Sequence, residues 1–329
     1  MPGLVENSQV GRREDLADIY SIADMKTTPF TSRVNKSAKP TNSEFDWIVD
    51  SYAAHRTTGT VDGTDVVNFE NHAENRGRLG NCVQVWRRTD KVSRLAEDLS
   101  NVAGVRSEIA LGAAKKLVEI KRDMESTFLS SNDGQVDNGS VEYKTSGLGL
   151  WIDTTGPTVP RSVPAAYRVD TAAINTTATA SLAETDVNAV LTAIYNEVGA
   201  GGEYWLLGGT TFRRRITEMT RFDTSGGTNT TNRIRNFNQA SSDSKITHTT
   251  AVYQGDYGTL SVETSLFIGG DTVDIDRAYV LNMDKIHLRS LAKPRVEHFP
   301  DLGGGKRFMI EAVAGLQVDN PLYLGKFQP

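Results

Sequence analysis

The most informative stretch of this chain of 329 residues is KRFMIEAVAGLQVDNP, residues 306–321. Apolar side chains occupy every second position from Phe308 to Val318, and the other face carries Arg307, Met309, Glu311, Val313 and Gln317. This alternation predicts one β-strand over 306–318 with a buried face. At about 3.3 Å per residue the strand would span roughly 43 Å, about twice the usual length. Asn320–Pro321 should end it.

Residues 91–129 predict an equally long helix. Their apolar residues recur mostly three or four positions apart, which gives one apolar stripe: Val92, Leu95, Leu99, Val102, Ile109, Ala113, Leu117, Ile120, Met124 and Phe128. A continuous helix of about 38 residues would measure roughly 57 Å. Gly104 and Gly112 could bend it.

Residues 44–90 predict a long hairpin. EFDWIVDSY (44–52) alternates, with Phe45, Trp47 and Val49 on one face, and NCVQVWRR (81–88) alternates again, with Val83 and Val85 opposite Trp86. The long polar stretch between them is rich in glycine, and loops of that length are usually functional or disordered. We interpret it as an excursion that projects from the body.

The second half of the chain predicts a small α/β module followed by further strands. A helix is expected from about Ser181 to Gly199, with Ser181 and Glu184 as a capping box and Thr185 or Asp186 as rival caps. A strand at 203–207, a helix from Thr210 or Thr211, a hairpin over 246–267 and strands at 278–283 and 285–291 follow. These elements are too elongated for one compact ball, so we infer a subunit that completes its burial against copies of itself.

Composition excludes several classes of protein. The formal charge is −5, from 36 basic and 41 acidic residues, and no part has the basic excess of a nucleic-acid-binding domain. Arg213, Arg214 and Arg215 form the densest basic run, which we interpret as a solvated or subunit-facing helix surface, with an acidic partner or nucleic acid as the alternative. No apolar run is long enough for a membrane helix, and the first residues do not resemble a secretory signal.

The sequence shows no catalytic or metal-binding pattern. Cys82 is the single cysteine, and the five histidines include no pair at helical metal-ligand spacing. Asp271, Asp274 and Asp276 do not fit a calcium-loop pattern, so we interpret them as an acidic turn. We therefore expect no catalytic residue, no cofactor and no metal, although an enzyme without a familiar motif stays open.

A second functional class rests on tryptophans. Trp47, Trp86 and Trp151 could stack sugars in a β-rich protein that binds carbohydrate or a receptor. Aromatic pairing or burial is the competing interpretation for Trp47 and Trp86. The long predicted helix argues against the sugar-binding alternative.

The order of elements, together with FDWIVDSY (45–52), VYQGDYGTLSV (252–262) and EAVAGLQVDNPLYLGKF (311–327), resembles the major capsid proteins of tailed double-stranded DNA bacteriophages. The local wording is similar to a short-tailed-phage branch of that family. The resemblance implies an α+β fold of the Hong Kong 97 type and a structural subunit that forms hexamers and pentamers of an icosahedral head. It identifies a scaffold and no chemical site.

The resemblance also implies a domain plan. Residues 1–43 would be an N-terminal arm, 44–90 the extended loop that reaches over a neighbour, and 91–180 the peripheral domain with its spine helix at 91–129. Residues 181–277 would form the axial domain, and 278–329 would return to the peripheral domain. The expected inter-subunit contact residues lie in or beside the extended loop: Trp47, Arg56, Arg76, Arg78 and Trp86.

The partners implied are copies of the chain itself, scaffolding, portal and decoration proteins, and packaged DNA held only by non-specific contact. A net negative charge suits a wall from which DNA must be released. The expected location is the virion shell, assembled in the host cytoplasm without a membrane. The Lys–Asn pair and catalytic Glu of crosslinking relatives have no assignable counterpart here, so we expect no crosslink.

Overall fold

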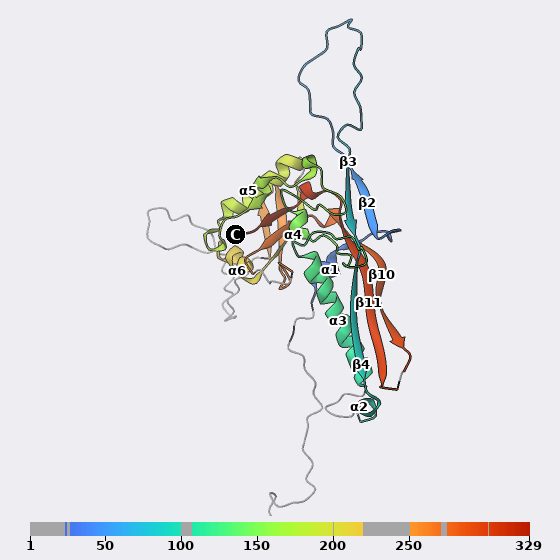
Figure 1. Ribbon diagram of the computed structural model, residues 1–329. Coiled ribbons are helices and arrows are strands. Elements are labelled where there is room, and N and C mark those ends of the chain that lie inside the picture. Colours follow the sequence, from blue (N-terminus) through green and yellow to red (C-terminus); the bar gives the residue numbers. More distant parts are fainter. Residues whose placement is uncertain are drawn as a thin grey trace, which may run out of the picture. The chain divides into compact units, whose positions relative to one another are not determined.

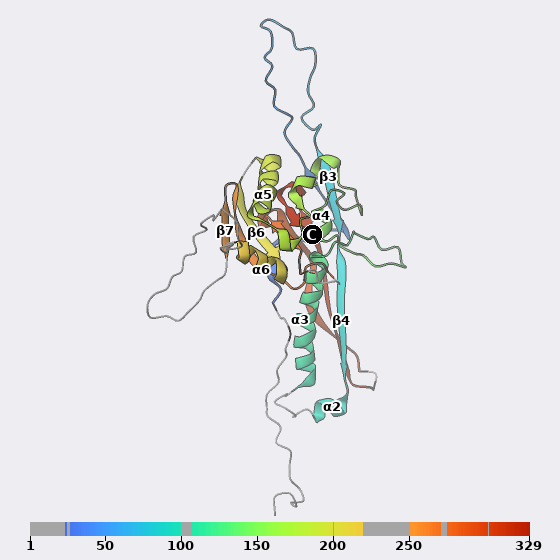
Figure 2. The same ribbon diagram turned by 90° about the vertical axis from the view of Figure 1, so that its left-hand side faces the viewer.

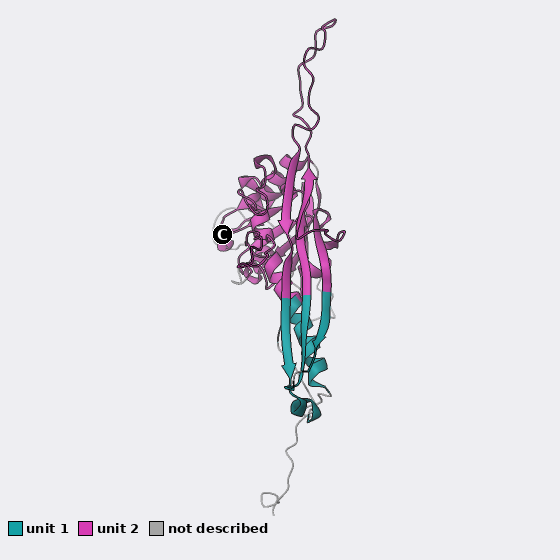
Figure 3. Cartoon of the chain, turned by 45° about the vertical axis from the view of Figure 1, so that its right-hand side comes forward, with its two compact units in different colours: residues 1–27, 87–120, 294–311 teal, residues 28–86, 121–293, 312–329 magenta. Residues whose placement is uncertain are grey.

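The structure is a computed structural model that describes residues 24, 27–99, 107–199, 201–219, 251–270, 275–301 and 303–329. The chain divides into two compact units (Figure 3). Unit 1 contains residues 1–27, 87–120 and 294–311, and unit 2 contains 28–86, 121–293 and 312–329.

Helices and strands are mixed along the chain, as the α+β prediction requires. The α-helices are α1 Pro29–Arg33, α2 Arg94–Asp98, α3 Glu108–Phe128, α4 Leu148–Trp151, α5 Glu184–Val198 and α6 Thr210–Met219. The strands are β1 Asn35–Lys36, β2 Glu44–Val49, β3 Gly77–Cys82, β4 Gln84–Val92, β5 Ile174–Asn175, β6 Gly202–Gly208, β7 Val252–Gly255, β8 Gly258–Thr264, β9 Ala278–Leu281, β10 Ile286–Phe299, β11 Lys306–Val318 and β12 Gly325–Phe327. Short 3₁₀ turns include η4 Thr179–Ser181 and η5 Met283–Lys285.

Unit 2 contains a six-stranded sheet in the order β5-β12-β9-β6-β8-β7, with α5 and α6 beside it (Figure 2). Its central strand β6 runs parallel to β8 and antiparallel to β9, and Tyr204 to Leu207 are buried in it. The predicted strand at 203–207 is thus confirmed, and β7 and β8 form a hairpin within the predicted range 246–267. Within residues 278–329, β9 and β12 pair in this sheet whereas β10 and β11 lie in the other one, so the expected return of this segment to the peripheral domain stays a prediction for β10 and β11.

Helix α5 begins later than the proposed Ser181–Glu184 box. Its N-cap is Ala183, and neither Ser181 nor the rival caps Thr185 and Asp186 take that position. The carboxylate of Asp186, in the first turn, accepts the backbone N–H of Ala183 at 2.7 Å. Gly199 ends the helix at φ 71°, a left-handed conformation that glycine adopts without strain. Val187, Val190, Leu191 and Ile194 form its buried face.

The second sheet has the order β1-β10-β11-β4. Strand β11 covers the predicted 13 residues, and its alternating apolar side chains are all at most 1% exposed: Phe308, Ile310, Ala312, Ala314, Leu316 and Val318. The predicted strand and its buried face are confirmed, and from Ala312 to Val318 the other face is buried as well. The partner strand β10 covers 286–291 of the predicted 285–291 and continues to Phe299.

The continuous helix predicted over 91–129 is wrong in its first half. Lys91 and Val92 belong to β4, Ser93 caps the five-residue α2, and α3 begins only at Glu108. Glu97 explains the start of α3, because its carboxylate accepts the N–H groups of Glu108 and Ile109 at 3.1 and 3.3 Å. The apolar residues of the sequence keep their helical spacing although α2 and α3 are separate helices, so the hydrophobic period alone did not reveal the separation.

The predicted hairpin exists with a different partner strand. Strand β2 pairs antiparallel with β3 from Glu44↔Cys82 to Val49↔Gly77, so it meets the predicted partner 81–88 only at Asn81 and Cys82. Phe45, Trp47 and Val49 are buried as predicted. Val83 interrupts the strand and is buried whereas Val85 is exposed, so the two valines do not share a face. The glycines and polar residues of β3 concealed it from the hydrophobic pattern.

The described part of the arm contains one helix and one strand. Pro29 is the first residue of α1, where a missing N–H costs nothing. The backbone N–H groups of Phe30 and Thr31 donate to the buried carboxylate of Glu125 at 2.8 and 2.7 Å. Desolvation raises the pKa of Glu125 despite these bonds.

Candidate inter-subunit contact surface

Residues 50–76, called the excursion below, form an extended loop that leaves the β2–β3 pair (Figure 1). They contain no helix or strand, only turns. Gly63 has φ 80° in the turn closed by the Thr64 N–H and the Val61 carbonyl, a conformation that side chains with a Cβ rarely adopt. The left-handed conformation of Gly63 therefore lets the chain reverse direction at this turn.

The excursion carries five large apolar side chains that the rest of its chain does not cover. They are Tyr52, Val61, Val66, Val67 and Phe69, each between 71% and 101% exposed. Single exposed apolar residues are ordinary, but five within 18 positions are typical of a contact surface. The sequence pattern did not reveal them because they are scattered among polar residues, with only Val66 and Val67 adjacent, and they follow no period.

The neck of the excursion packs against other residues of unit 2. The Tyr167 hydroxyl donates to the Asn75 carbonyl, and its ring lies so close to Gly77 that a Cβ there would come within 2.8 Å. A Cβ on Gly80 would come within 2.1 Å of the Asp46 carboxylate. Strand β3 therefore needs glycine at both positions to pack against its neighbours.

The three predicted arginines lie at the surface, and each has a carboxylate partner in its own chain. Arg56 pairs with Glu70 across the two limbs of the excursion, and Arg76 pairs with Asp50 at 3.1 Å at its neck. Arg78 pairs with Asp46 on the β2–β3 ladder. Exposed pairs of this kind contribute about 0–1 kcal/mol each. They organise the excursion weakly, and a role in subunit contacts stays a prediction.

The two predicted tryptophans are core side chains that lie apart. Trp47 stacks on Phe45 and Trp151 and donates from its indole N–H to the Asp319 carbonyl at 3.3 Å. Trp86 packs edge-on against Phe128 and donates to Thr127 at 3.2 Å. Trp47, Trp86 and Trp151 are 9%, 6% and 1% exposed, so no indole is free to stack a sugar.

Cys82 is the last residue of β3, at the end of the β2–β3 ladder away from the excursion, and it is fully buried. Burial, with Glu44 and Asp46 nearby, raises its pKa to about 12. A thiol in that state is not a nucleophile at neutral pH.

Neither a metal cluster nor a membrane-spanning helix occurs in the described ranges. No group of three His, Cys, Asp or Glu side chains there is placed to hold a metal ion, and Asp271 and Asp274 lie outside those ranges. None of the helices there has the length and apolar character to cross a membrane.

Comparison with known proteins identifies the family. A family model described as SU10 major capsid protein matches residues 4–328. No curated protein sequence matches the chain.

Solved phage capsids share the fold. The capsid protein of cyanophage A-1(L) has a TM-score of 0.64 at 12% identity, with 96% of each chain covered. That of cyanophage Pam1 has a TM-score of 0.60 at 10% identity, covering 99% of this chain and 98% of that one. The capsid of a native GTA particle scores 0.59 at 9% identity, covering 98% and 95%. The chain therefore belongs to the SU10 major capsid protein family, and it is a structural shell subunit of a phage head with the Hong Kong 97-like fold, not an enzyme.

Proposed function

We propose that copies of this chain form hexamers and pentamers of an icosahedral shell around packaged double-stranded DNA, and that the excursion closes contacts between neighbouring copies. The observation that carries this proposal is the set of five exposed apolar side chains on the excursion. Burying a side chain of this size contributes about 1.5–3 kcal/mol. Because every copy brings the same five, modest contacts add up over a closed shell.

The domain plan of the family is part of the proposal, with the strand pairing taken into account. Residues 1–43 act as the arm and 44–90 as the extended loop. The peripheral domain includes α3, β10 and β11, and the axial domain is the six-stranded sheet with α5 and α6. The similarity to short-tailed-phage heads stays a prediction.

Further partners follow from the family and not from a particular contact. Scaffolding, portal and decoration proteins, assembly in the host cytoplasm and non-specific contact with DNA belong to the proposal. A formal charge of −5 supports weak contact with DNA.

The test shortens the excursion without disturbing its neck. Residues 54–72 are replaced by Asn-Gly, which keeps the β2–β3 ladder, the Asp50–Arg76 pair and the Asn75–Tyr167 contact. We expect a folded subunit by circular dichroism that no longer forms rings or shells in sedimentation and negative-stain imaging.

A second variant separates side chains from chain length. Replacing Tyr52, Val61, Val66, Val67 and Phe69 by serine keeps the loop, and Ile48→Ser serves as a matched control because Ile48 is exposed on β2 outside the excursion. Normal shells from the shortened chain would refute the role of the excursion. A monomer at every concentration of the unmodified protein would refute the shell proposal itself.

A further inference from the structure

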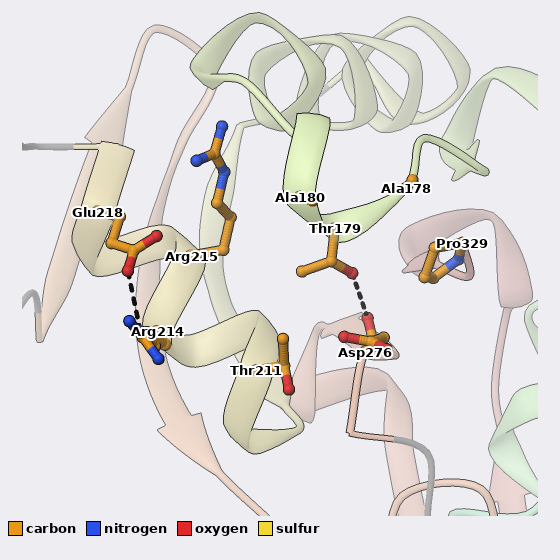
Figure 4. Close-up of a pocket in the computed structure, with 9 residues that line it drawn as sticks. All are labelled: Ala178, Thr179, Ala180, Thr211, Arg214, Arg215, Glu218, Asp276 and Pro329. Atoms are coloured by element: carbon orange, nitrogen blue, oxygen red, sulfur yellow. Dashed lines mark hydrogen bonds and ion pairs between the residues drawn. The ribbon is translucent and has the colours of Figure 1, made fainter. Parts of the chain in front are cut away.

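A pocket of about 640 Å³ lies at one corner of the six-stranded sheet (Figure 4). Its wall combines Ala178 to Ala180 of the η4 segment with Thr211, Arg214, Arg215 and Glu218 of α6, and with Asp276 and Pro329. The excursion contributes nothing to it. We call it the corner pocket.

Arg215 is the unsatisfied charge of the corner pocket. Arg214 is neutralised by Glu218 at 2.9 Å. Arg215 uses its Nε to donate to the Leu182 carbonyl at 2.9 Å, and within the described residues no carboxylate lies within ion-pair distance of its guanidinium. Figure 4 shows its side chain rising from α6 beside Ala180. The hydrogen bond to the Leu182 carbonyl holds the guanidinium in place, and its terminal N–H groups stay available to an acidic partner.

Asp256 is the complementary group. It occupies the tight turn between β7 and β8, is exposed, and has no partner among the described side chains. The turn is held in place because Tyr257 stacks on Tyr195 with ring centroids 4.7 Å apart, and because a Cβ on Gly201 would come within 2.8 Å of the Tyr257 carbonyl. An unpaired carboxylate is thus presented on a fixed support.

The strand register places these two groups at opposite corners of one sheet. The β7–β8 turn that carries Asp256 lies at the end of the sheet where Gly202 pairs with Gly258. The corner pocket lies at the opposite end, where Gly208 pairs with Ala278. Ala178 and Pro329 follow β5 and β12 at one edge, and β7 is the other edge, about 24 Å away at five strand spacings. Complementary groups on opposite sides of a subunit suit a head-to-tail contact, which closes into a ring under rotation.

We propose that Asp256 of one copy enters the corner pocket of the next and pairs with Arg215, with the Thr211 hydroxyl within the same wall. The pairing rests on the proposed ring assembly, and it names one ion pair that sets the order and direction of neighbours. The pairing also assigns a role to Arg215 within the basic run at 213–215. A carboxylate pairing with a guanidinium in a partly enclosed pocket is favoured over one in open water.

Charge exchange tests the pairing on the full chain. Arg215→Glu and Asp256→Arg each place like charges together, and we expect each to raise the concentration needed for rings or shells by about tenfold or more. The double variant R215E/D256R should restore assembly to near that of the unmodified protein. R215E/D284R is the matched control, because Asp284 is an exposed acid elsewhere, and it should not restore assembly.

Circular dichroism verifies that each variant folds. If R215E does not fold because the hydrogen bond to Leu182 is lost, the neutral substitutions Arg215→Gln and Asp256→Asn are used in place of the charge reversals. The double variant of these two substitutions should assemble no more weakly than either single variant. Single reversals that assemble normally, additive neutral variants or a failed exchange would overturn the pairing while leaving the shell proposal intact. If the unmodified chain never assembles, both proposals fall.

Discussion

Strand β11 and the excursion use apolar residues in opposite ways. In β11 every second side chain from Phe308 to Val318 is buried within the chain, whereas in the excursion all five large apolar side chains are exposed. The periodic pattern marks burial that one chain completes by itself. The scattered pattern marks apolar surface that this chain leaves uncovered, which suits a subunit of a shell.

The largest expected loss of stability comes from a substitution on the buried face of β11. Leu316→Ala should lower the free energy of unfolding of the unassembled subunit by about 3 kcal/mol, because it opens a cavity at a fully buried position. Denaturant unfolding followed by circular dichroism measures it. A loss as small as that of an excursion substitution would show that β11 is not core.

A buried ion pair provides the next test. Lys326 donates to Asp153 at 2.7 Å with its own side chain only 3% exposed, so Asp153→Asn should cost about 2 kcal/mol by leaving that ammonium without its counter-charge. Glu70→Gln, which breaks the exposed Arg56–Glu70 pair, is the control and should change little. Equal effects in thermal melts would contradict the difference in burial.

The same pair predicts a dependence on pH. Burial disfavours the ionised form of Asp153, but the hydrogen bonds from Lys326 and Thr155 outweigh it and hold its pKa below the ordinary value. Its stabilisation is therefore present above about pH 4 and is lost as the pH falls towards the lowered pKa. Melting temperatures between about pH 6 and about pH 3 should fall less steeply for D153N than for the unmodified chain.

A smaller effect should distinguish the neck from the excursion. Gly77→Ala puts a Cβ 2.8 Å from the Tyr167 ring and should cost about 1 kcal/mol. Gly59→Ala is the matched control, because nothing lies within 4 Å of a Cβ at that position. The same decrease in melting temperature for both variants would mean that Gly77 at the neck is packed no more closely than Gly59 in the excursion.

The smallest effect on stability is expected in the excursion itself. Phe69→Ser should change the free energy of unfolding of the subunit by less than about 0.5 kcal/mol, since its ring contacts little of its own chain. Assembly in sedimentation should nevertheless weaken. A subunit as destabilised as L316A would show that Phe69 packs within its own chain.

Particular elements show where sequence reasoning succeeded and where it failed. Strand β11, the buried face of β2 and the end of α5 at Gly199 follow from local periodicity and glycine chemistry, and the structure confirms them. The start of α3 depends on Glu97 accepting the first N–H groups of that helix, eleven and twelve residues onward, which no periodic pattern encodes. Strand β3 was missed because Gly77 and Gly80 serve close packing and not hydrophobicity.

The sequence by itself determined the fold class, the absence of familiar catalytic motifs and the resemblance to phage capsid proteins, because element order and alternation are local properties of the chain. Only the tertiary structure decided that Trp47 and Trp86 are core, that the apolar tip of the excursion is exposed, and that β9 and β12 join the six-stranded sheet. It also set Arg215 and Asp256 at opposite corners of that sheet. Burial and strand partners depend on residues far apart in the chain, so they arise only when the chain has folded.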